Sequence, residues 1–241
     1  MFERTRILCF DLDNTLWDVW PVIARAERAV YDWLSENHPC VASRYSIEEL
    51  RAARISLARA EPSLAHDVTA LRVESLARIA REVGAPETLG HDAFEVFYAV
   101  RNAVTLYDDV LPALSRLGRH FRLASFSNGN ADLRRIGLAQ YFELSLTAGD
   151  TGVAKPDARA FAAVLARLGS RAEEVVYIGD DPQADVVGAR DAGLRTVWVN
   201  RGVMSWPLTL PAADLEVSDL KELVSRAGCT GDALTNAEHH R

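Results

Sequence analysis

Short apolar runs that end in polar residues recur along the chain, first near the N-terminus and again only after residue 120. An apolar run without alternation is typical of a parallel strand that is buried on both faces of a sheet. The third and the last of these runs are the weakest. The six strands predicted in this way cover residues 6–12, 121–126, 143–146, 175–178, 196–199 and 214–217.

Helical patterns, with apolar residues three and four positions apart, lie between the later strands. Strands that alternate with helices predict an α/β fold, because parallel strands need a long crossover connection between them. We therefore expect a Rossmann-like, doubly wound parallel sheet with helices on both faces. The predicted helices of this part cover residues 110–117, 131–138, 158–168 and 184–192.

Residues 17–106 carry a different pattern, rich in alanine and arginine and without a convincing strand. Turn signals, Gly90 among them, divide this segment into four helical stretches. We predict an α/β core over residues 1–16 and 107–227, an inserted four-helix bundle over 17–106, and a mobile polar tail over 228–241. The predicted helices of the insert cover residues 19–34, 47–60, 68–83 and 93–104.

Composition narrows the functions that such a fold can serve. The formal net charge of −7 argues against a general nucleic-acid binder, and no apolar stretch approaches the roughly 20 residues that span a membrane. The charged N-terminus does not resemble a signal peptide, and Cys9, Cys40 and Cys229 lie far apart in the sequence. We expect a cytoplasmic protein with reduced cysteines that acts neither on nucleic acid nor at a membrane.

Two aspartates follow the first strand, and ligands of open α/β sheets bind at the carboxyl ends of strands. Asp11 and Asp13 are two positions apart, so their side chains project to the same face if the strand geometry continues. Two close carboxylates repel each other, and Mg²⁺ is the cation that suits such hard oxygen ligands. The alternatives are a solvated acidic loop, or Asp13 as the cap of a helix.

The next two clusters combine a hydroxyl, an amide and a lysine. Ser127 and Asn128 follow the second strand and precede a helix, where free N–H groups either bind an anion or are capped in the ordinary way. Lys155 stands before Pro156 at the start of another helix, and its ammonium either points at the sheet edge or lies on the surface.

A fourth cluster follows the strand at 175–178. Asp180, Asp181 and Asp185 supply up to three carboxylates, although Asp181 and Asp185 are also favourable residues for a helix start. Each cluster alone is a weak signal. Because all four fall at predicted strand ends, we expect them to form one site.

In this order the clusters resemble the motifs of phosphatases of the haloacid dehalogenase superfamily. They read DxDNT from Asp11, SNG from Ser127, KP from Lys155 and GDDxxxD ending at Asp185. The helical insert is similar to the small cap that this family carries after its first motif. The resemblance implies Mg²⁺ as cofactor, held by Asp11, the backbone carbonyl of Asp13 and Asp180.

The resemblance also implies a role for each remaining residue. Asp11 is the expected nucleophile and Asp13 the expected general acid and base, while Lys155 neutralises the charge of nucleophile and phosphate. Ser127 and the N–H groups near Asn128 are expected to hold the phosphoryl oxygens. The expected supporting residues are Thr15 at the turn that carries Asp13, Asp185 beside Lys155 or a metal-bound water, and Asp181.

A small phosphate ester is the expected partner, and the chain is expected to be a monomer or a homodimer. The segments 126–130, 137–142 and 179–181 resemble a narrower branch that acts on FMN and on the aminoribitylamino-uracil phosphate of riboflavin synthesis. Asp13 favours phosphate chemistry, because family dehalogenases need no acid for a halide and typically lack an aspartate there. The alternatives are a phosphomutase, a 2-haloacid dehalogenase-like hydrolase, and a non-catalytic interaction protein on this fold.

Overall fold

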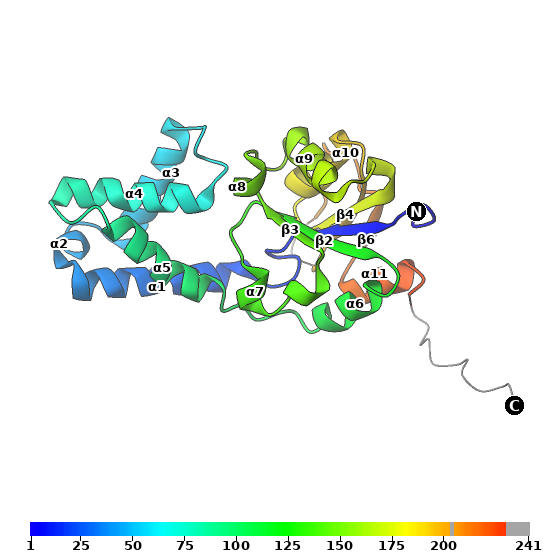
Figure 1. Cartoon of the computed structure of the whole chain (residues 1–241), viewed down its shortest axis with the longest axis horizontal. Coiled ribbons are helices and arrows are strands. Elements are labelled where there is room, and N and C mark those ends of the chain that lie inside the picture. Colours follow the sequence, from blue (N-terminus) through cyan, green and yellow to red (C-terminus); the bar gives the residue numbers. More distant parts are fainter. Residues whose placement is uncertain (203–204, 230–241) are drawn as a thin grey trace, which may run out of the picture.

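A parallel sheet of six strands forms the centre of one half of the molecule, and its order is β3-β2-β1-β4-β5-β6 (Figure 1). The computed structural model describes residues 1–202 and 205–229, so residues 230–241 of the predicted tail lie outside the described residues. All six predicted strands are present, and the predicted α/β fold is confirmed. The strands are β1 (Ile7–Phe10), β2 (Arg122–Ser127), β3 (Leu144–Thr147), β4 (Val175–Gly179), β5 (Arg195–Val199) and β6 (Leu215–Val217).

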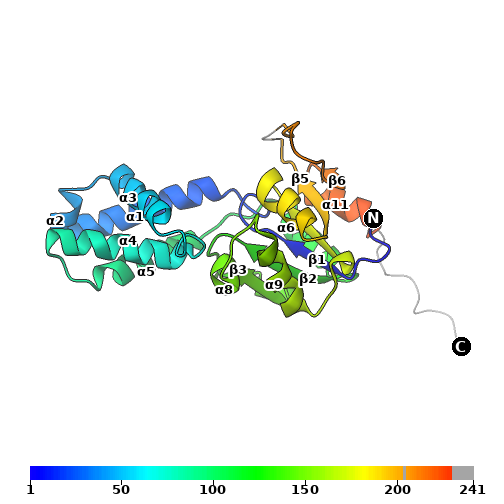
Figure 2. The same cartoon turned by 90° about the horizontal axis from the view of Figure 1, so that it is seen from above.

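The central strand β1 is buried on both faces, as its uninterrupted apolar run predicts. Leu8 and Phe10 point into a core shared with α6 (Val110–Leu117) and α11 (Leu220–Arg226). Ile7 and Cys9 point the other way, into a core shared with α9 (Ala158–Leu168) and α10 (Gly188–Asp191). Figure 1 shows α9 and α10 above the sheet and α6 and α11 below it, and Figure 2 looks onto the face that α9 covers.

The chain order reverses beside β1, which decides where a ligand can bind. Strands β1, β2 and β3 run outward to one side, and the chain then crosses over to place β4 against the other edge of β1. In open α/β sheets, the crevice at the carboxyl ends of the strands around such a switch point is the usual ligand site.

Residues 19–101 form helices that extend away from the sheet (Figure 1) and share an apolar core of their own. Helix α3 begins with a capping box between Ser46 and Glu49, and α4 ends at Gly84, which adopts a φ of 71°. The helices are α1 (Val19–Asn37), α2 (Pro39–Ala42), α3 (Ile47–Ala60), α4 (Val68–Val83) and α5 (Leu89–Arg101).

Helix α5 differs from the prediction at both ends. It begins at Leu89 rather than at residue 93, and it ends at Arg101 rather than at residue 104. Gly90, which suggests a turn in the sequence, lies inside the helix. A Cβ at Gly90 would stand 2.6 Å from the carbonyl oxygen of Val73, so the glycine permits the close approach of α5 to α4.

Two helices of the core also depart from the sequence prediction. Only one helical turn, α7 (Leu133–Ile136), forms within the predicted 131–138, because Gly137 turns the chain with a φ of 83° before the short helix η1 (Ala139–Tyr141). The helix predicted over 184–192 starts earlier, as a π-helical segment η3 (Pro182–Val187) that continues into α10. The short elements η2 (Ala172–Glu174) and α8 (Ala148–Thr151) complete the core.

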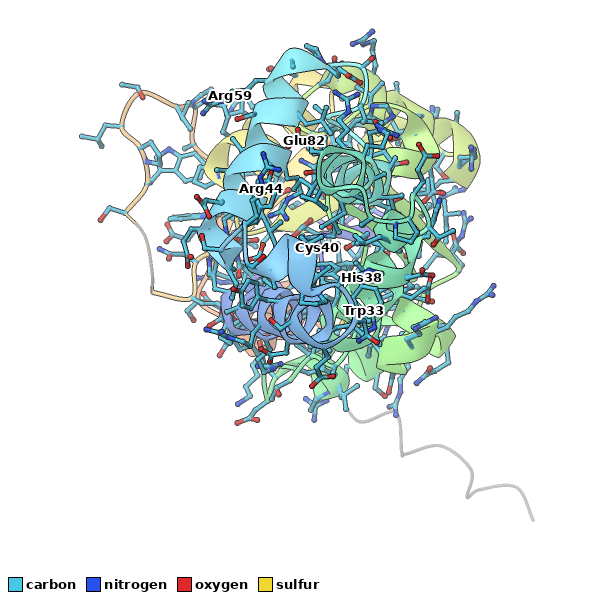
Figure 3. All side chains as sticks on the ribbon, turned by 90° about the vertical axis from the view of Figure 1, so that its left-hand side faces the viewer. Trp33, His38, Cys40, Arg44, Arg59 and Glu82 are labelled. Carbon is cyan, nitrogen blue, oxygen red and sulfur yellow. The ribbon has the colours of Figure 1, made fainter. Side chains whose placement is uncertain are left out.

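The thiols of Cys9, Cys40 and Cys229 are free. Cys40, His38 and Trp33 lie at the end of the helical bundle that faces the viewer in Figure 3, far from the sheet. Within the described ranges, no helix combines the length and the apolar character needed to cross a membrane.

Gly188 is expected to be indispensable for the packing of η3 and α10. A Cβ there would stand 2.8 Å from the main-chain Cα and oxygen of Pro156, atoms that cannot swing aside. We expect Gly188→Ala to lower the free energy of unfolding by about 1–3 kcal/mol in urea titrations. In the control Gly149→Ala, the new Cβ would lie 3.4 Å from its nearest neighbour, Cγ of Asp67, which is an ordinary contact. The free energy of unfolding of this variant should therefore stay close to that of the wild type. Equal stability of the two variants would contradict this packing argument.

Candidate active site

The carboxyl ends of β1, β2 and β4 bring the predicted clusters together. Asp11 follows β1 and its backbone N–H donates to the carbonyl oxygen of Ile178 at 2.8 Å, which ties it to the neighbouring strand. Ser127 is the last residue of β2, and Asp180 directly follows β4. The sheet topology therefore gathers residues that are up to 169 positions apart in the sequence.

A buried ammonium joins these strand ends. The Nζ atom of Lys155 donates to Asp11 Oδ1 at 2.6 Å, to Asp185 Oδ1 at 2.6 Å and to the hydroxyl of Tyr177 at 2.8 Å. Only 6% of Lys155 is exposed, so it is no surface lysine. Burial alone lowers the pKa of Lys155, but Asp11 and Asp185 outweigh it and raise that pKa above its usual value, so the ammonium stays protonated.

Asn128 and Tyr177 hold this ammonium in place. The side-chain amide of Asn128 accepts from the backbone N–H of Lys155 at 2.8 Å and donates to its carbonyl oxygen at 3.0 Å. The Tyr177 hydroxyl donates to the carbonyl oxygen of Phe126 at 2.6 Å, which leaves its lone pairs for Lys155. The Asn128 side chain thus binds the backbone of Lys155, a contact that the sequence does not predict. The sequence does not predict the role of Tyr177 either, because this residue lies within an apolar strand.

Three carboxylates lie close together here, and two of them, Asp11 and Asp185, bind the ammonium. Oxygen atoms of Asp11, Asp180 and Asp185 lie within 4.8 Å of one another. Burial raises the pKa of Asp11, and burial together with the charges of Asp11 and Asp185 raises the pKa of Asp180 to about 8. The pKa of Asp185 rises to about 6, mainly because of burial. One ammonium does not balance two buried carboxylates and a half-buried one, and this oxygen cluster fits a divalent cation such as Mg²⁺.

Thr15 and Asp180 form a hydrogen-bonded pair. The Thr15 hydroxyl donates to Asp180 Oδ1 at 3.1 Å, and the indole of Trp198 donates to the Asp180 carbonyl oxygen at 2.7 Å. Arg201 anchors the same turn, since its Nη2 donates to the Thr15 carbonyl oxygen at 2.8 Å. Thr15 therefore orients a carboxylate of the cluster directly, in addition to lying on the turn that carries Asp13.

Asp181 and Asp185, four positions apart, have different surroundings. Asp181 is exposed, and its carboxylate accepts from the backbone N–H groups of Gln183 and Ala184, both at 2.8 Å, as the N-cap of η3. Asp185 is 2% exposed and binds Lys155 as well as the Asp181 N–H. The helix-start interpretation therefore holds for Asp181, whereas Asp185 belongs to the site.

Asp13 is held by two side chains whose contacts with it the sequence does not predict. Its Oδ1 accepts from the Trp17 indole at 2.8 Å, and Nη2 of Arg101 donates to Oδ1 at 2.7 Å and to Oδ2 at 2.6 Å. Arg101 is the last residue of α5 and is 1% exposed. A Cβ at Gly129 would stand 2.5 Å from Asp13 Oδ2, so any larger residue there would displace the Asp13 carboxylate from this position.

The remaining groups complete a pocket that handles negative charge. The buried Ser127 hydroxyl accepts from the Gly129 N–H at 3.1 Å and lies at the strand end beside Asp11 and Asp13. Asn14 adopts a φ of 60°, a conformation that asparagine tolerates, and thereby turns the chain between Asp13 and Thr15. Four carboxylates, from Asp11, Asp13, Asp180 and Asp185, and the Lys155 ammonium thus lie together at the carboxyl ends of the strands.

Known proteins share this arrangement of the chain. Residues 5–193 match the family of haloacid dehalogenase-like hydrolases. The chain is 33% identical over 230 residues to the 5-amino-6-(5-phospho-D-ribitylamino)uracil phosphatase YigB of Escherichia coli (strain K12), covering 92% of this chain and 96% of that protein. It is 41% identical over 147 residues to a phosphoserine phosphatase of Thermus thermophilus, covering 58% of each chain.

A solved structure agrees with the fold over most of its length. The crystal structure of a 2-haloacid dehalogenase from Pseudomonas syringae pv. Tomato DC3000 superposes with a TM-score of 0.86 at 37% identity, covering 92% of this chain and 97% of that one. The family match extends from β1 through η3 and α10 and contains every residue of the buried cluster. The chain belongs to the haloacid dehalogenase-like hydrolases.

Proposed function

We propose that this protein is a Mg²⁺-dependent phosphatase that hydrolyses small phosphate monoesters through an aspartyl-phosphate on Asp11. The observation that carries the proposal is the pair of carboxylates at the end of β1, Asp11 against the Lys155 ammonium and Asp13 two positions on. Phosphatases among the relatives, the Escherichia coli protein first, support the reaction class.

In the first step, a carboxylate oxygen of Asp11 attacks the phosphorus of the ester. The new oxygen–phosphorus bond forms as the bond to the leaving alcohol breaks, and Asp13 gives its proton to the leaving oxygen. Lys155 lies 2.6 Å from Asp11 and offsets the charge that gathers between the carboxylate and the phosphoryl group. The product of this step is an aspartyl-phosphate and the free alcohol.

In the second step, water replaces Asp11 on phosphorus. Asp13, now ionised, takes a proton from the water as its oxygen attacks, and the Asp11–phosphorus bond breaks. Inorganic phosphate leaves, Asp11 is again a free carboxylate, and Asp13 is protonated for the next turnover. The same residue serves both steps because the first leaves it in the state that the second requires.

Asp11, Asp180 and the backbone carbonyl of Asp13 would hold the Mg²⁺ ion, and Asp185 lies beside them. The fit rests on the crowding of Asp11, Asp180 and Asp185, whose oxygens lie within 4.8 Å of one another against a single ammonium. When bound, the ion supplies positive charge that offsets repulsion between the phosphate and these carboxylates.

Residues 17–106 are proposed to act as a cap over the core of residues 1–16 and 107–227. Two side-chain contacts support this division: Arg101 of α5 binds Asp13, and Asn130 donates to the Thr69 hydroxyl of α4 at 3.1 Å. A helical layer that contacts the acid–base residue can exclude water and select the alcohol part of the ester. The sequence similarity makes FMN and other riboflavin-pathway phosphates the first substrates to test.

A dehalogenase is the second candidate, because the superposed Pseudomonas structure is described as a 2-haloacid dehalogenase. Both reactions begin with attack by the same aspartate. They differ in the leaving group: an alkoxide needs a proton, whereas a halide leaves without one. Asp13 is a carboxyl group that can supply this proton, and its presence favours the phosphatase.

Asp11→Asn tests the reaction class. We expect the wild-type protein to release phosphate from p-nitrophenyl phosphate only with Mg²⁺, and the variant to lose this activity, because an amide is no nucleophile. The control Asp132→Asn changes an aspartate that caps α7 outside the site and should keep full turnover, since asparagine caps equally well. Halide release from 2-haloacids without phosphate release from any ester would contradict the proposal.

Lys155→Arg keeps the positive charge at position 155 and changes the shape of the group that carries it. The ammonium fits among three acceptors in a buried space, which a longer planar guanidinium cannot match. We expect kcat to fall on the order of 10²–10³-fold, as for the loss of one key donor, in steady-state assays of phosphate release. Lys221→Arg, at the only other lysine of the chain, is the matched control on the surface of α11. Near-normal kcat in Lys155→Arg would mean that positive charge alone suffices.

A further inference from the structure

A cavity of about 230 Å³ lies between the helices of residues 19–101 and the loop after β2. Asp13 and Gly129 line its core side, and Arg54, Arg72 and Arg101 line its helical side. The cavity opens directly beside the acid–base carboxylate, where the alcohol part of a phosphate ester would lie.

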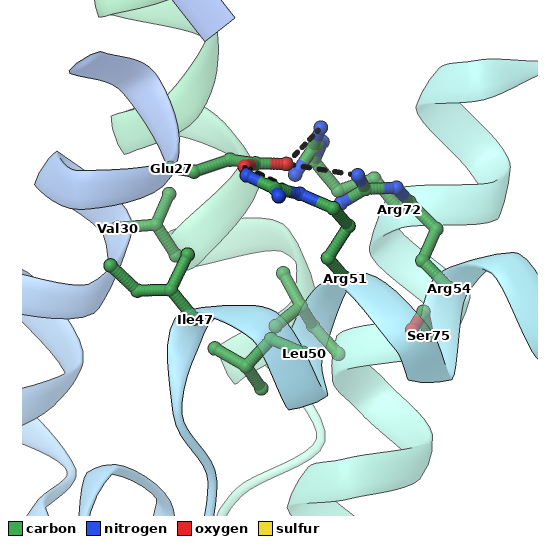
Figure 4. A pocket seen from close by; sticks show the side chains of 9 residues that line it. Glu27, Val30, Ile47, Leu50, Arg51, Arg54, Arg72 and Ser75 are labelled. Carbon is green, nitrogen blue, oxygen red and sulfur yellow. Dashed lines mark hydrogen bonds and ion pairs between the residues drawn. The ribbon is translucent and has the colours of Figure 1, made fainter. Parts of the chain in front are cut away.

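Two of the arginines that line this cavity, Arg54 and Arg72, share a single carboxylate with a third arginine that lies outside it. Arg51, Arg54 and Arg72 gather around Glu27, which is 6% exposed (Figure 4). Arg51 binds Glu27 Oε2, and Arg54 donates to Oε1 at 2.9 Å, so both carboxylate oxygens are engaged. The nearest nitrogen of Arg72 stays 3.9 Å away, beyond hydrogen-bond distance. One carboxylate therefore faces three guanidinium groups.

Arg72 is the most weakly paired arginine of this cluster, since its contact with Glu27 at 3.9 Å is an ion pair without a hydrogen bond. Its side chain is 11% exposed, and its guanidinium stacks on Phe97, with 3.5 Å between Cζ and the ring centroid. Among the described residues it donates no hydrogen bond that satisfies ordinary geometry. Burial and the neighbouring charge of Arg54 lower the pKa of Arg72 to about 9, which shows how poorly its charge is compensated. A buried cation of this kind is costly unless an anion pairs with it.

Arg101 supplies a second, independent sign of a missing ligand. Its Nη2 atom binds Asp13, while Nη1 is buried and has no hydrogen-bond partner in the part of the chain that the structure describes. Arg101 and Arg72 line the same cavity. Guanidinium groups present rigid forks of donors that match carboxylate and phosphate oxygens.

We propose that this cavity binds a second oxyanion of the substrate, a carboxylate or a further phosphate, through Arg72 and Arg101. The substrate class is then a small phosphate monoester with two anionic groups, one at Asp11 and the other in the cavity. This inference rests on the proposed phosphatase function and adds a selection rule to it. Esters whose alcohol part is uncharged, FMN among them, would give Arg72 and Nη1 of Arg101 no oxyanion and are therefore expected to be the poorer substrates in such a screen.

Matched ester pairs test the rule, with kcat/KM for phosphate release as the measurement. O-phosphoserine is compared with O-phosphoethanolamine for the carboxylate, and propane-1,3-diyl bisphosphate with propyl phosphate for the second phosphate. We expect the ester with the second oxyanion to be favoured at least about 10-fold in one pair or both. The pair that shows the preference identifies which oxyanion the cavity takes. Equal values within both pairs would overturn the inference.

Arg72→Gln removes the fork and keeps a polar, shorter side chain. We expect kcat/KM for the favoured ester to fall about 10- to 100-fold, with the value for the partner ester that lacks the second oxyanion within about threefold. Arg72→Lys should recover part of the preference. The control Arg81→Gln, on the same helix but paired with Glu74 at the surface, should behave as wild type. An equal loss for both esters in Arg72→Gln would indicate a structural role and overturn the inference.

A binding measurement separates failure of this inference from failure of the proposed function. Malonate and inorganic phosphate are titrated against the full chain in thermal unfolding. We expect one of them to raise Tm in the wild-type protein and in Arg81→Gln, and to raise it less in Arg72→Gln, where phosphate can still bind only beside Asp11. Such a result supports the anion site even if no ester is hydrolysed. An equal Tm rise in Arg72→Gln, or no rise with either anion, contradicts it.

Discussion

The site depends on one buried charge. The Lys155 ammonium binds Asp11, Asp185 and Tyr177, and so joins the ends of β1 and β4 and, through Tyr177, the end of β2. Removing one partner from such a buried ion pair typically costs about 3–5 kcal/mol, because the other charge is left uncompensated. The same ammonium that orders the strand ends is the cation that a phosphoryl group would meet. The contacts of Lys155 therefore serve both the fold and the proposed reaction.

The parts of the fold that the sequence predicts are those with strong local patterns. The strands are buried apolar runs, and Asp11 and Asp180 lie at their ends because parallel strands all point the same way. Local sequence signals predict helix boundaries wrongly where contacts between elements determine them. Gly90 has the composition of a turn but lies in a helix because α4 is close, and Gly137 ends a helix that its neighbours favour.

The residues that the sequence does not reveal act across long separations. Arg101 reaches Asp13 over 88 positions, and nothing in the chain distinguishes it from the other arginines. In the sequence Tyr177 is one residue of an apolar strand, and only the fold shows that its hydroxyl accepts a hydrogen bond from Lys155. The sequence alone does not distinguish the roles of Asp181 and Asp185. The direction of η3 makes Asp181 its N-cap and Asp185 a buried partner of Lys155. Such roles depend on tertiary geometry, which periodicity does not encode.

The most direct test of the central claim is to identify the covalent intermediate. The protein is mixed with a phosphate ester and Mg²⁺, quenched during turnover and treated with borohydride, which reduces an aspartyl-phosphate to homoserine. Peptide mass spectrometry then locates the altered residue. The account predicts homoserine at position 11 in the wild-type protein, dependent on the ester. Phosphate release with an unaltered Asp11, or with the reduction at another aspartate, would contradict it.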